Sequence, residues 1–311
     1  MTNLIKDGET TKILAELEEG VKNVFHSDRY KEYLKSMSKF HHYSFGNIML
    51  IAMQRPDASR VAGMTTWNQL GRSVKKGEHG LKILAPIITK HTVRNAVVDE
   101  TSCPMVDIKT NQPVIEEQTM SVRRGYRTVS VFDIAQTEGD DLPSLAQELQ
   151  GRVQDYERLK SALVQVAQCP VSFRKTKGEK GSYSPGQHRI VISNELSEIQ
   201  TVKTLVHELA HSRLHHRKGA DPVKKDRPTT EIEAESVAFV VCQHLGLDTS
   251  NYSFEYLAGW SNDEQIKELK GALAIIQKTS DAIITELDAL LGQNAHDTHD
   301  IQNTHDAALA S

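Results

Sequence analysis

The stretch TLVHELAHSRLHH, residues 204–216, carries four histidines and one glutamate on a segment with helical apolar spacing. His207 and His211 stand four residues apart, so both imidazoles project from one face of a helix and can reach one ion. Glu208 completes the pattern His-Glu-x-x-His. In this pattern two neutral imidazoles hold Zn²⁺ and the glutamate takes a proton from water. The stretch therefore predicts a zinc site with Glu208 as the catalytic base.

A third ligand is expected on the following helix, TEIEAESVAFVVCQHLG at residues 230–246, where Thr230 and Glu233 form a capping-box pattern. On a helical wheel Glu231 and Glu235 fall among the apolar positions, whereas Glu233 falls on the polar, solvated side. Carboxylates on an apolar face need partners, because burying an unpaired charge is costly. We expect Glu231 to bind zinc and Glu235 to accept from a ligating histidine, and the reverse order stays open. Alternatively, both acids merely complement the helix dipole.

Other side chains near this motif have weaker assignments. His215 lies one turn beyond His211 and is expected to be a helix-end histidine, and His216 is expected at the surface. No spacing selects a residue that would stabilise the transition state. The side chains considered for that role are Tyr183, His188, Tyr252 and Tyr256.

Two β-type runs precede the zinc helix, VSFRK at 171–175 and HRIVIS at 188–193. They flank the glycine-rich segment GEKGSYSPG at 178–186, so we expect a hairpin with a long loop.

The pattern HELAH…EIEAES resembles the gluzincin layout of thermolysin-like peptidases, and its short helix-loop-helix form is similar to the ImmA/IrrE family of metallopeptidases. The resemblance implies zinc as cofactor and a peptide bond as substrate. It also implies a strand or hairpin before the His-Glu-x-x-His helix that can bind an extended peptide, and GQHRIVIS at 186–193 lies where that strand should be.

The first part of the chain combines basic and aromatic side chains in two stretches, residues 40–56 and 61–86. Basic groups attract phosphate and aromatic rings stack on unpaired bases, although aromatic residues are more often part of a core. The candidate contacts to single-stranded DNA are Tyr43, Phe45, Asn47, Trp67, Arg72, Lys75, Lys76 and Lys82.

The strings YSFGNIMLI…QRP…VAGMTTWNQLGRSVKKGEHGLKILAP, followed by VFDIAQTEGDDLP, resemble the ArdC-type N-terminal domain of plasmid antirestriction proteins over about residues 20–145. The resemblance implies a protein of a mobile element in which a domain that binds single-stranded DNA precedes a zincin domain.

The whole chain has 311 residues, enough for two domains, and the acidic, turn-rich segment at 136–144 suggests their boundary. We expect an α+β fold. Residues 1–143 would form a small α+β DNA-binding domain, and residues 144–292 a mainly helical zincin-like domain with a small β-sheet. The polar tail at 293–311 is expected to be disordered.

Composition narrows the class of protein. A net charge of −4 means that a DNA-binding surface must be a local basic patch. No apolar run approaches the ~18 residues of a membrane span, so no membrane partner is expected. Three widely spaced cysteines without a Cys-x-x-Cys pair argue against disulfides and a cysteine zinc site, which indicates the cytoplasm.

The sequence therefore predicts an antirestriction-like protein that binds single-stranded DNA and carries a zinc metallopeptidase domain. Two alternatives stay open. In one, the zinc is structural and DNA coating or occlusion is the whole function. In the other, the chain is an ImmA-like peptidase that cleaves a repressor or defence protein.

Overall fold

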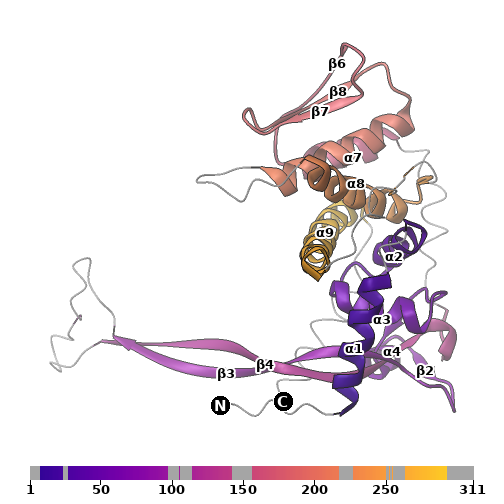
Figure 1. Ribbon diagram of the computed structural model, residues 1–311, viewed down its shortest axis with the longest axis vertical. Helices are drawn as coiled ribbons and strands as arrows, with labels where there is room; N and C mark the ends of the chain where they lie inside the picture. Colours follow the sequence, from indigo (N-terminus) through magenta and orange to yellow (C-terminus); the bar gives the residue numbers. More distant parts are fainter. Residues whose placement is uncertain are drawn as a thin grey trace. The chain divides into compact units, whose positions relative to one another are not determined.

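A computed structural model of the chain describes residues 8–23, 27–96, 105, 114–141, 156–216, 227–249, 252, 254 and 263–292. These residues form helices and strands in mixed order (Figure 1), which confirms the predicted α+β class. The helices are α1 (Gly8–Asn23), α2 (Ser27–Lys39), α3 (Phe45–Gln54), α4 (Met64–Gln69), the short 3-10 helix η1 (Ile134–Gln136), α6 (Tyr156–Val166), α7 (Glu198–His215), α8 (Arg227–His244) and α9 (Asp263–Leu290). The strands are β1 (Val61–Ala62), β2 (Arg72–Val74), β3 (Leu81–Ala96), β4 (Ile115–Asp133), β5 (Thr137–Gly139), β6 (Val171–Arg174), β7 (Gly181–Ser184) and β8 (Arg189–Ser193).

The chain divides into two compact units. One consists of Met1–Ala15 and Lys82–Val129, and the other of Glu16–Leu81 and Ser130–Ser311. The boundary predicted at 143/144 falls among residues 142–155, outside the described residues, and stays a prediction. The same holds for the tail at 293–311.

The main feature of the first unit is a long ribbon in which β3 pairs with β4 (Figure 1). Two strands alone cannot bury both faces of a ribbon, so its side chains beyond residue 87 are mostly exposed. Within this unit, Thr10 Oγ1 of α1 lies 3.1 Å from Thr128 Oγ1 of β4.

The second unit contains a small core around Trp67 of α4. Its indole ring is fully buried, packs with Ala62 and Phe132, and donates its Nε1–H to the carbonyl of Phe132 at 2.9 Å. Beside this core, β1 pairs with the end of β4, and β2 pairs with β5. The short elements are therefore held together by one aromatic side chain that satisfies its only donor internally.

Asp133 organises the turn that follows β4. Its carboxylate accepts backbone N–H groups of Ser59 at 2.8 Å, Arg60 at 3.2 Å and Ala135 at 3.0 Å. Its own N–H donates to the side chain of Gln136, which completes a capping box at the start of η1. The buried carboxylate thus satisfies donors from two segments more than 70 residues apart in sequence.

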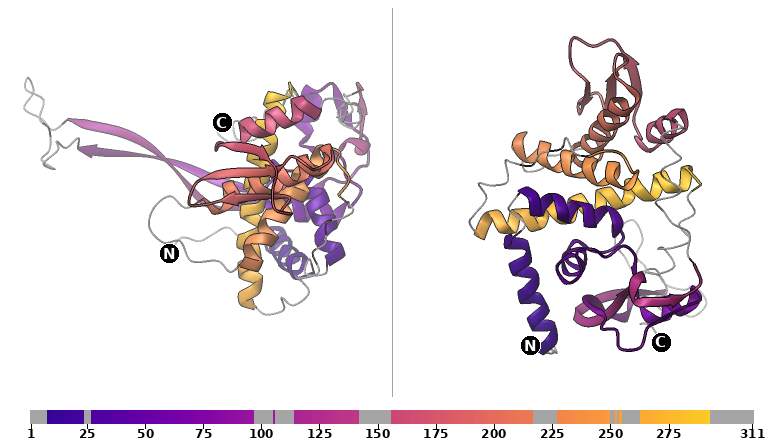
Figure 2. Two further views of the ribbon diagram at one scale, coloured as in Figure 1. Left: turned by 90° about the horizontal axis from the view of Figure 1, so that it is seen from above. Right: turned by 90° about the vertical axis from the view of Figure 1, so that its right-hand side faces the viewer.

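The remaining part of the second unit is layered. A sheet of β6, β8 and β7 lies on one side of α7, and α8 and then α9 follow on the other side (Figures 1 and 2). The strand β8 packs against α7, and its residues Ile190, Val191 and Ile192 are buried. Since α8 contacts α2, α7 and α9, it is covered on several sides.

The predicted hairpin of VSFRK and HRIVIS is wrong. The strand β6 pairs with β8 in parallel, with Val171 opposite Ile190, so these two runs cannot form a hairpin. The segment between them contains a third strand, β7, which pairs with β8 in antiparallel fashion and places Ser184 opposite Arg189. The sequence GSYS at 181–184 has too little apolar patterning to be recognised as a strand.

Two further findings concern the described residues alone. Among them, no helix is long and apolar enough to cross a membrane. Cys169 and Cys242 both carry free thiols, and Cys103 lies outside the described residues.

Candidate metal centre

The two histidines of the His-Glu-x-x-His motif lie on one face of α7. The helix begins after Ser197, whose hydroxyl accepts from the backbone N–H of Gln200 at 3.4 Å. Three turns later, the Nε2 atoms of His207 and His211 lie 3.1 Å apart. Neighbouring turns of a helix bring side chains four residues apart together, and here both rings present the same nitrogen to one point.

Glu231 of α8 approaches the same point from the next helix. Its Oε2 lies 3.6 Å from Nε2 of His207 and 3.4 Å from Nε2 of His211. In a tetrahedral zinc site with bonds of about 2.0–2.1 Å, the ligand atoms lie roughly 3.3 Å from one another. The three donor atoms therefore have the chemistry and the mutual spacing that such an ion requires.

Glu235 contacts the other side of the first histidine. Its Oε2 lies 3.1 Å from Nδ1 of His207, one turn of α8 beyond Glu231. A carboxylate at this distance accepts the Nδ1–H and keeps the lone pair of Nε2 available for an ion. The two glutamates thus take different positions, one beside both Nε2 atoms and one behind a single ring.

Glu208 is 7% exposed and belongs to α7, which packs against the strand β7. Burial raises the pKa of its carboxyl group, while the charge of His207 and a hydrogen bond from the backbone of Tyr183 oppose this rise. The net effect is a raised pKa, which brings a carboxyl group closer to the range where it can both take and return a proton.

The two imidazoles have different proton affinities in the absence of an ion. Burial lowers the pKa of His207, but its hydrogen bond to Glu235 and the nearby carboxylates outweigh burial, and the pKa is raised. Burial and the charge of His207 lower the pKa of His211 to about 4. His211 is therefore the less basic of the two imidazoles.

The expectation that Glu233 is a solvated capping residue is wrong. The helix α8 starts at Arg227, three residues before Thr230. Thr230 and Glu233 therefore lie inside the helix and cannot cap its start. Glu233 is 1% exposed, whereas the side chain of Glu231 is 48% exposed. The helical wheel assumed one polar face, but α8 is covered on several sides, and the acids that point toward α7 are the more accessible ones.

The neighbouring histidines and tyrosines form two arrangements. His215 lies at the end of α7 with its Nε2 3.2 Å from the carbonyl of Thr230, outside the His207–His211–Glu231 group. The hydroxyl of Tyr183 lies 2.9 Å from Nδ1 of His188 and 3.0 Å from Nδ1 of His216, and these two rings stack. The sequence contained no spacing that would bring these three residues together.

The structure excludes Tyr252 from the side chains considered for stabilising the transition state. Its hydroxyl lies 3.6 Å from Sγ of Cys242 in a buried environment, pointing into the core. Tyr256 lies outside the described residues.

Trp67 was predicted to contact DNA, and this prediction is wrong. The side chain has no exposed surface, and its only polar atom already donates to the carbonyl of Phe132. A ring without exposed surface cannot stack on a base.

Three predicted DNA contacts lie near the start of α3. Tyr43 is half-buried and donates its hydroxyl to the carbonyl of Val61 at 3.0 Å, and burial raises its pKa. Phe45 and Asn47 are half-buried, and the backbone N–H of Asn47 lies 3.4 Å from the hydroxyl of Ser44. Their contacts with DNA stay predictions.

The four predicted basic contacts differ in their surroundings. The guanidinium of Arg72 donates to β5 and to the residue after it, and Lys75 Nζ donates to the carbonyl of Ala135 at 2.9 Å. Lys76 is exposed in the turn after β2. Lys82 pairs with Glu9 at 3.2 Å. Much of this charge is therefore used to hold the fold together.

An exposed basic cluster on the β3–β4 ribbon was not among the predicted contacts. It centres on RRGYR at 123–127, where Arg123 Nη1 donates to the hydroxyl of Tyr126 at 2.8 Å and its guanidinium lies 5.2 Å from that ring. Across the ribbon, Arg124 Nη2 lies 2.9 Å from Nε2 of His91. We name this cluster the basic ribbon; its exposed members are Lys90, His91, Arg123, Arg124, Tyr126 and Arg127.

Two known protein families match different parts of the chain. Residues 5–132 match the family described as the N-terminal domain of anti-restriction factor ArdC. Residues 164–268 match the IrrE N-terminal-like domain of the M78 peptidase family. The chain therefore joins an ArdC-type N-terminal domain to an IrrE-like, M78 peptidase-type domain, and the resemblance seen in the sequence is confirmed.

Individual proteins that are similar to the chain have low sequence identity to it. The chain is similar to the uncharacterized protein pXO2-81 of Bacillus anthracis, with 28% identity over 285 residues. The match covers 83% of this chain and 47% of the relative, so the chain spans about half the length of the curated protein it matches.

Two crystal structures of the antirestriction ArdC protein from the R388 plasmid are also similar. The metal-free structure has 18% identity and a TM-score of 0.45, covering 80% of this chain and 85% of that one. The Mn(II)-bound structure has 16% identity and a TM-score of 0.47, covering 89% of this chain and 98% of that one.

Proposed function

We propose that the chain is an antirestriction-like protein with a zinc-dependent peptidase site in its IrrE-like domain and a single-stranded DNA-binding surface in its ArdC-type domain. The observation that carries the enzymatic half is the convergence of three donor atoms, from His207, His211 and Glu231, within 3.1–3.6 Å of one another.

The ligand set selects the ion. Two imidazole nitrogens and one carboxylate oxygen form a known catalytic zinc set, which leaves one position open. His207, His211 and Glu231 would hold the ion, and Glu235 would fix the ring of His207 through its Nδ1–H. When bound, such an ion polarises a carbonyl group and acidifies water.

Glu208 supplies the proton transfers in this proposal. Its carboxylate follows His207 on α7 and is shielded from bulk water, and its raised pKa suits a group that first accepts a proton from the attacking water. The same carboxyl group then gives the proton to the leaving amine. The backbone N–H of Tyr183 keeps the carboxylate oriented through its hydrogen bond.

The strand β7 is the proposed docking edge for an extended peptide. Sequence reasoning assigned this role to the segment 186–193, but β8 is paired on both sides and has no open edge. β7 has β8 on one side only among the described strands, and its Tyr183 contacts Glu208. A peptide paired with the outer edge of β7 would therefore lie beside the catalytic carboxylate.

The basic ribbon is the proposed main contact for single-stranded DNA. Its arginines and lysine can bind phosphates along a strand, and Tyr126 offers an exposed ring for stacking. Lys75 and Lys76, on the separate turn after β2, extend the set of basic residues in the ArdC-type domain.

The peptidase half is tested with the purified full chain. Wild type should retain one zinc that His207→Ala loses, and Glu208→Gln should keep this zinc while hydrolysing a random-sequence peptide library about 10²–10⁴-fold more slowly. The exposed His79 provides the control variant His79→Ala, which should change neither property. Equal hydrolysis by wild type and Glu208→Gln would contradict the peptidase and favour a structural zinc.

The DNA half is tested by measuring the affinity of the full chain for a single-stranded oligonucleotide at several salt concentrations. Replacing Arg123, Arg124 and Arg127 by alanine should weaken binding and reduce the slope of log affinity against log salt by about 2, since each lost phosphate contact removes about 0.7. The control replaces three exposed lysines outside the ArdC-type match. They are Lys175, Lys177 and Lys180. Identical slopes for both triple variants would refute the basic ribbon as the contact surface.

A further inference from the structure

A second cluster of histidines and aspartates lies away from the His-Glu-x-x-His motif. His41 and His42 belong to the turn between α2 and α3, and His244 is the last residue of α8. Asp281 and Asp288 stand on α9. None of these five residues belongs to the site proposed above, so the two sites can be tested separately.

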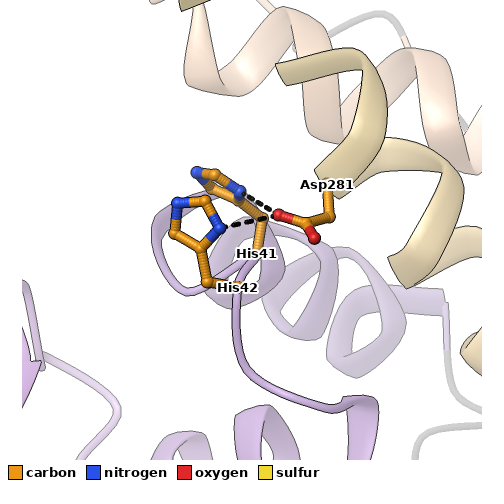
Figure 3. Close-up of side chains that lie close together, drawn as sticks. All are labelled: His41, His42 and Asp281. Atoms are coloured by element: carbon orange, nitrogen blue, oxygen red, sulfur yellow. Dashed lines mark hydrogen bonds and ion pairs between the residues drawn. The ribbon is translucent and has the colours of Figure 1, made fainter. Parts of the chain in front are cut away.

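The ring of His41 is oriented by a carboxylate. Its Nδ1 lies 2.9 Å from Oδ1 of Asp281, and Nδ1 of His42 lies 2.8 Å from the same oxygen (Figure 3). Gln277 of α9 also donates to the backbone carbonyl of His41 at 2.5 Å. Since a carboxylate oxygen only accepts, both rings carry a proton on Nδ1, and the lone pair of a neutral His41 is on Nε2.

The ring of His244 faces an oxygen on each side. Its Nδ1 lies 3.3 Å from the carbonyl of Ser38, and its Nε2 lies 3.2 Å from Oδ1 of Asp288. The carbonyl requires a proton on Nδ1. The lone pair of Nε2 then faces the carboxylate oxygen of Asp288, and a cation bound by both atoms would stabilise this arrangement. A histidine that donates its other N–H to a backbone carbonyl is the usual arrangement around a bound metal.

Three possible metal ligands, from His41, His244 and Asp288, lie close together in this cluster. A nitrogen of His41, a nitrogen of His244 and a carboxylate oxygen of Asp288 all lie within 4.8 Å of one another, and the rings of His41 and His244 are 5.2 Å apart in an edge-to-face arrangement. The 3.2 Å between His244 and Asp288 is close to the roughly 3.3 Å that separates ligands of a tetrahedral ion. His41 is 5% exposed, so the group is well shielded.

We propose that His41, His244 and Asp288 form a second site for a divalent transition-metal ion, with Nε2 of both histidines and the carboxylate of Asp288 as ligands. Zn²⁺ is the ion that this set of two imidazoles and one carboxylate suits best. Asp281 and the carbonyl of Ser38 orient the two rings by accepting their Nδ1–H groups.

The group of His41, His42 and Asp281 is explained without an ion. Its contacts of 2.8 and 2.9 Å are ordinary N–H···O hydrogen bonds to one carboxylate oxygen, shorter than the spacing of zinc ligands. An ion in the group of His41, His244 and Asp288 would instead be held between Nε2 of His244 and the carboxylate of Asp288, which lie 3.2 Å apart. Neutral His41 is compatible with this role, because burial lowers its pKa to about 4 despite the bond to Asp281.

An ion at this position would act as a cross-link. It would join the turn after α2, the last residue of α8 and the last turn of α9, which are far apart in sequence but close in the fold. His41 belongs to the ArdC-type match and His244 to the IrrE-like match. Binding to the folded chain alone stabilises it by mass action, so the ion would strengthen the attachment of these segments to one another.

The experiment counts zinc in the full chain after loading with Zn²⁺ and removal of weakly held metal. Wild type should hold two equivalents, and the double variant His207→Ala/His211→Ala should hold one. Adding Asp288→Asn to that double variant should remove the last equivalent, while Asp288→Asn alone should leave one. His79→Ala serves as the control and should keep two. Zinc should also raise the melting temperature of the double variant, and this rise should disappear with Asp288→Asn.

Two results would overturn the second site. One is a folded Asp288→Asn chain, by circular dichroism, that keeps as much zinc as its parent. The other is a His207→Ala/His211→Ala variant that holds no zinc. In this variant His41, His244 and Asp288 are unchanged, so the absence of zinc would show that they do not bind it. If Asp288→Asn does not fold, X-ray absorption of zinc in the double variant decides: two imidazole ligands support the site, and fewer refute it. Loss of zinc on His207→Ala concerns only the first site.

Discussion

Replacing Asp133 by asparagine should destabilise the second unit strongly, although it changes only one atom of the side chain. The carboxylate is 2% exposed and accepts three backbone N–H groups, two on Oδ2 from Ser59 and Arg60 and one on Oδ1 from Ala135. Asparagine keeps one acceptor oxygen and turns an NH₂ group toward a backbone donor.

The expected loss follows from these bonds. Hydrogen bonds to a charged acceptor contribute about 1.5–3 kcal/mol and those to a neutral one about 1 kcal/mol. If the amide oxygen replaces Oδ2, two bonds weaken by roughly 1 kcal/mol each and the bond to Ala135, worth about 2 kcal/mol, is lost. The free energy of unfolding should therefore fall by about 4 kcal/mol, a large part of the roughly 5–15 kcal/mol typical of a folded protein.

Urea unfolding followed by tryptophan fluorescence measures this loss close to its origin. The chain contains two tryptophans, and a Trp260→Phe background leaves Trp67, which packs beside Phe132. Asp57→Asn is the matched control because that side chain is 80% exposed, and it should change stability by less than about 0.5 kcal/mol. A loss below about 1.5 kcal/mol for Asp133→Asn would show that the three bonds do not act as described.

Three further predictions concern other residues. Glu235→Ala should weaken zinc binding at the proposed catalytic site by about 10–100-fold, because His207 loses the acceptor of its Nδ1–H. Glu235→Gln keeps an acceptor and should lose less affinity. Competition with a chelator measures both variants, and zinc affinities equal to that of wild type would exclude the orienting role. In chelator, native His41, with a pKa of about 4, should contribute up to about 3 kcal/mol to the fall in the free energy of unfolding between pH ~6.5 and 4, because the unfolded chain takes up a proton there that native His41 does not. His211, whose pKa is also about 4, adds to the total fall in both wild type and variant. His41→Gln should therefore show a smaller fall than wild type in urea unfolding, and an unchanged fall would refute this origin. At pH 8 the native protein should be alkylated at the half-buried Cys169 well before Cys242, because burial raises the pKa of the Cys242 thiol to about 11. Mass spectrometry of the labelled peptides shows the order of labelling. Early labelling of Cys242 would contradict its placement in the core.

The sequence predicted the local parts of the candidate site well. Four-residue spacing places His207 and His211 on one face of any helix, whatever surrounds that helix. The positions of Glu231 and Glu235 beside these histidines also match the expected geometry, although the argument for them was partly wrong. It treated them as buried, while Glu233 is the buried one, because burial depends on the neighbours of α8 and not on its own pattern.

Features that depend on distant segments could not be predicted from the sequence. Nothing in the sequence around Trp67 shows whether an indole ring points into a core or toward solvent. The parallel pairing of β6 with β8 was missed because the strand between them in sequence, β7, has four residues with almost no strand signal. His41 and His244 meet although about 200 residues lie between them, and only the packing of α2, α8 and α9 brings them together.

The helix α8 has 18 residues and carries Glu231 in its second turn, Glu235 at its middle and His244 at its end. At 1.5 Å per residue, Glu231 and His244 are about 20 Å apart along one rod. A rod of this kind does not bend easily at fixed packing, so turning or sliding it displaces both ends together. A metal ion bound at one of the two proposed sites would then limit how far α8 can move at the other site.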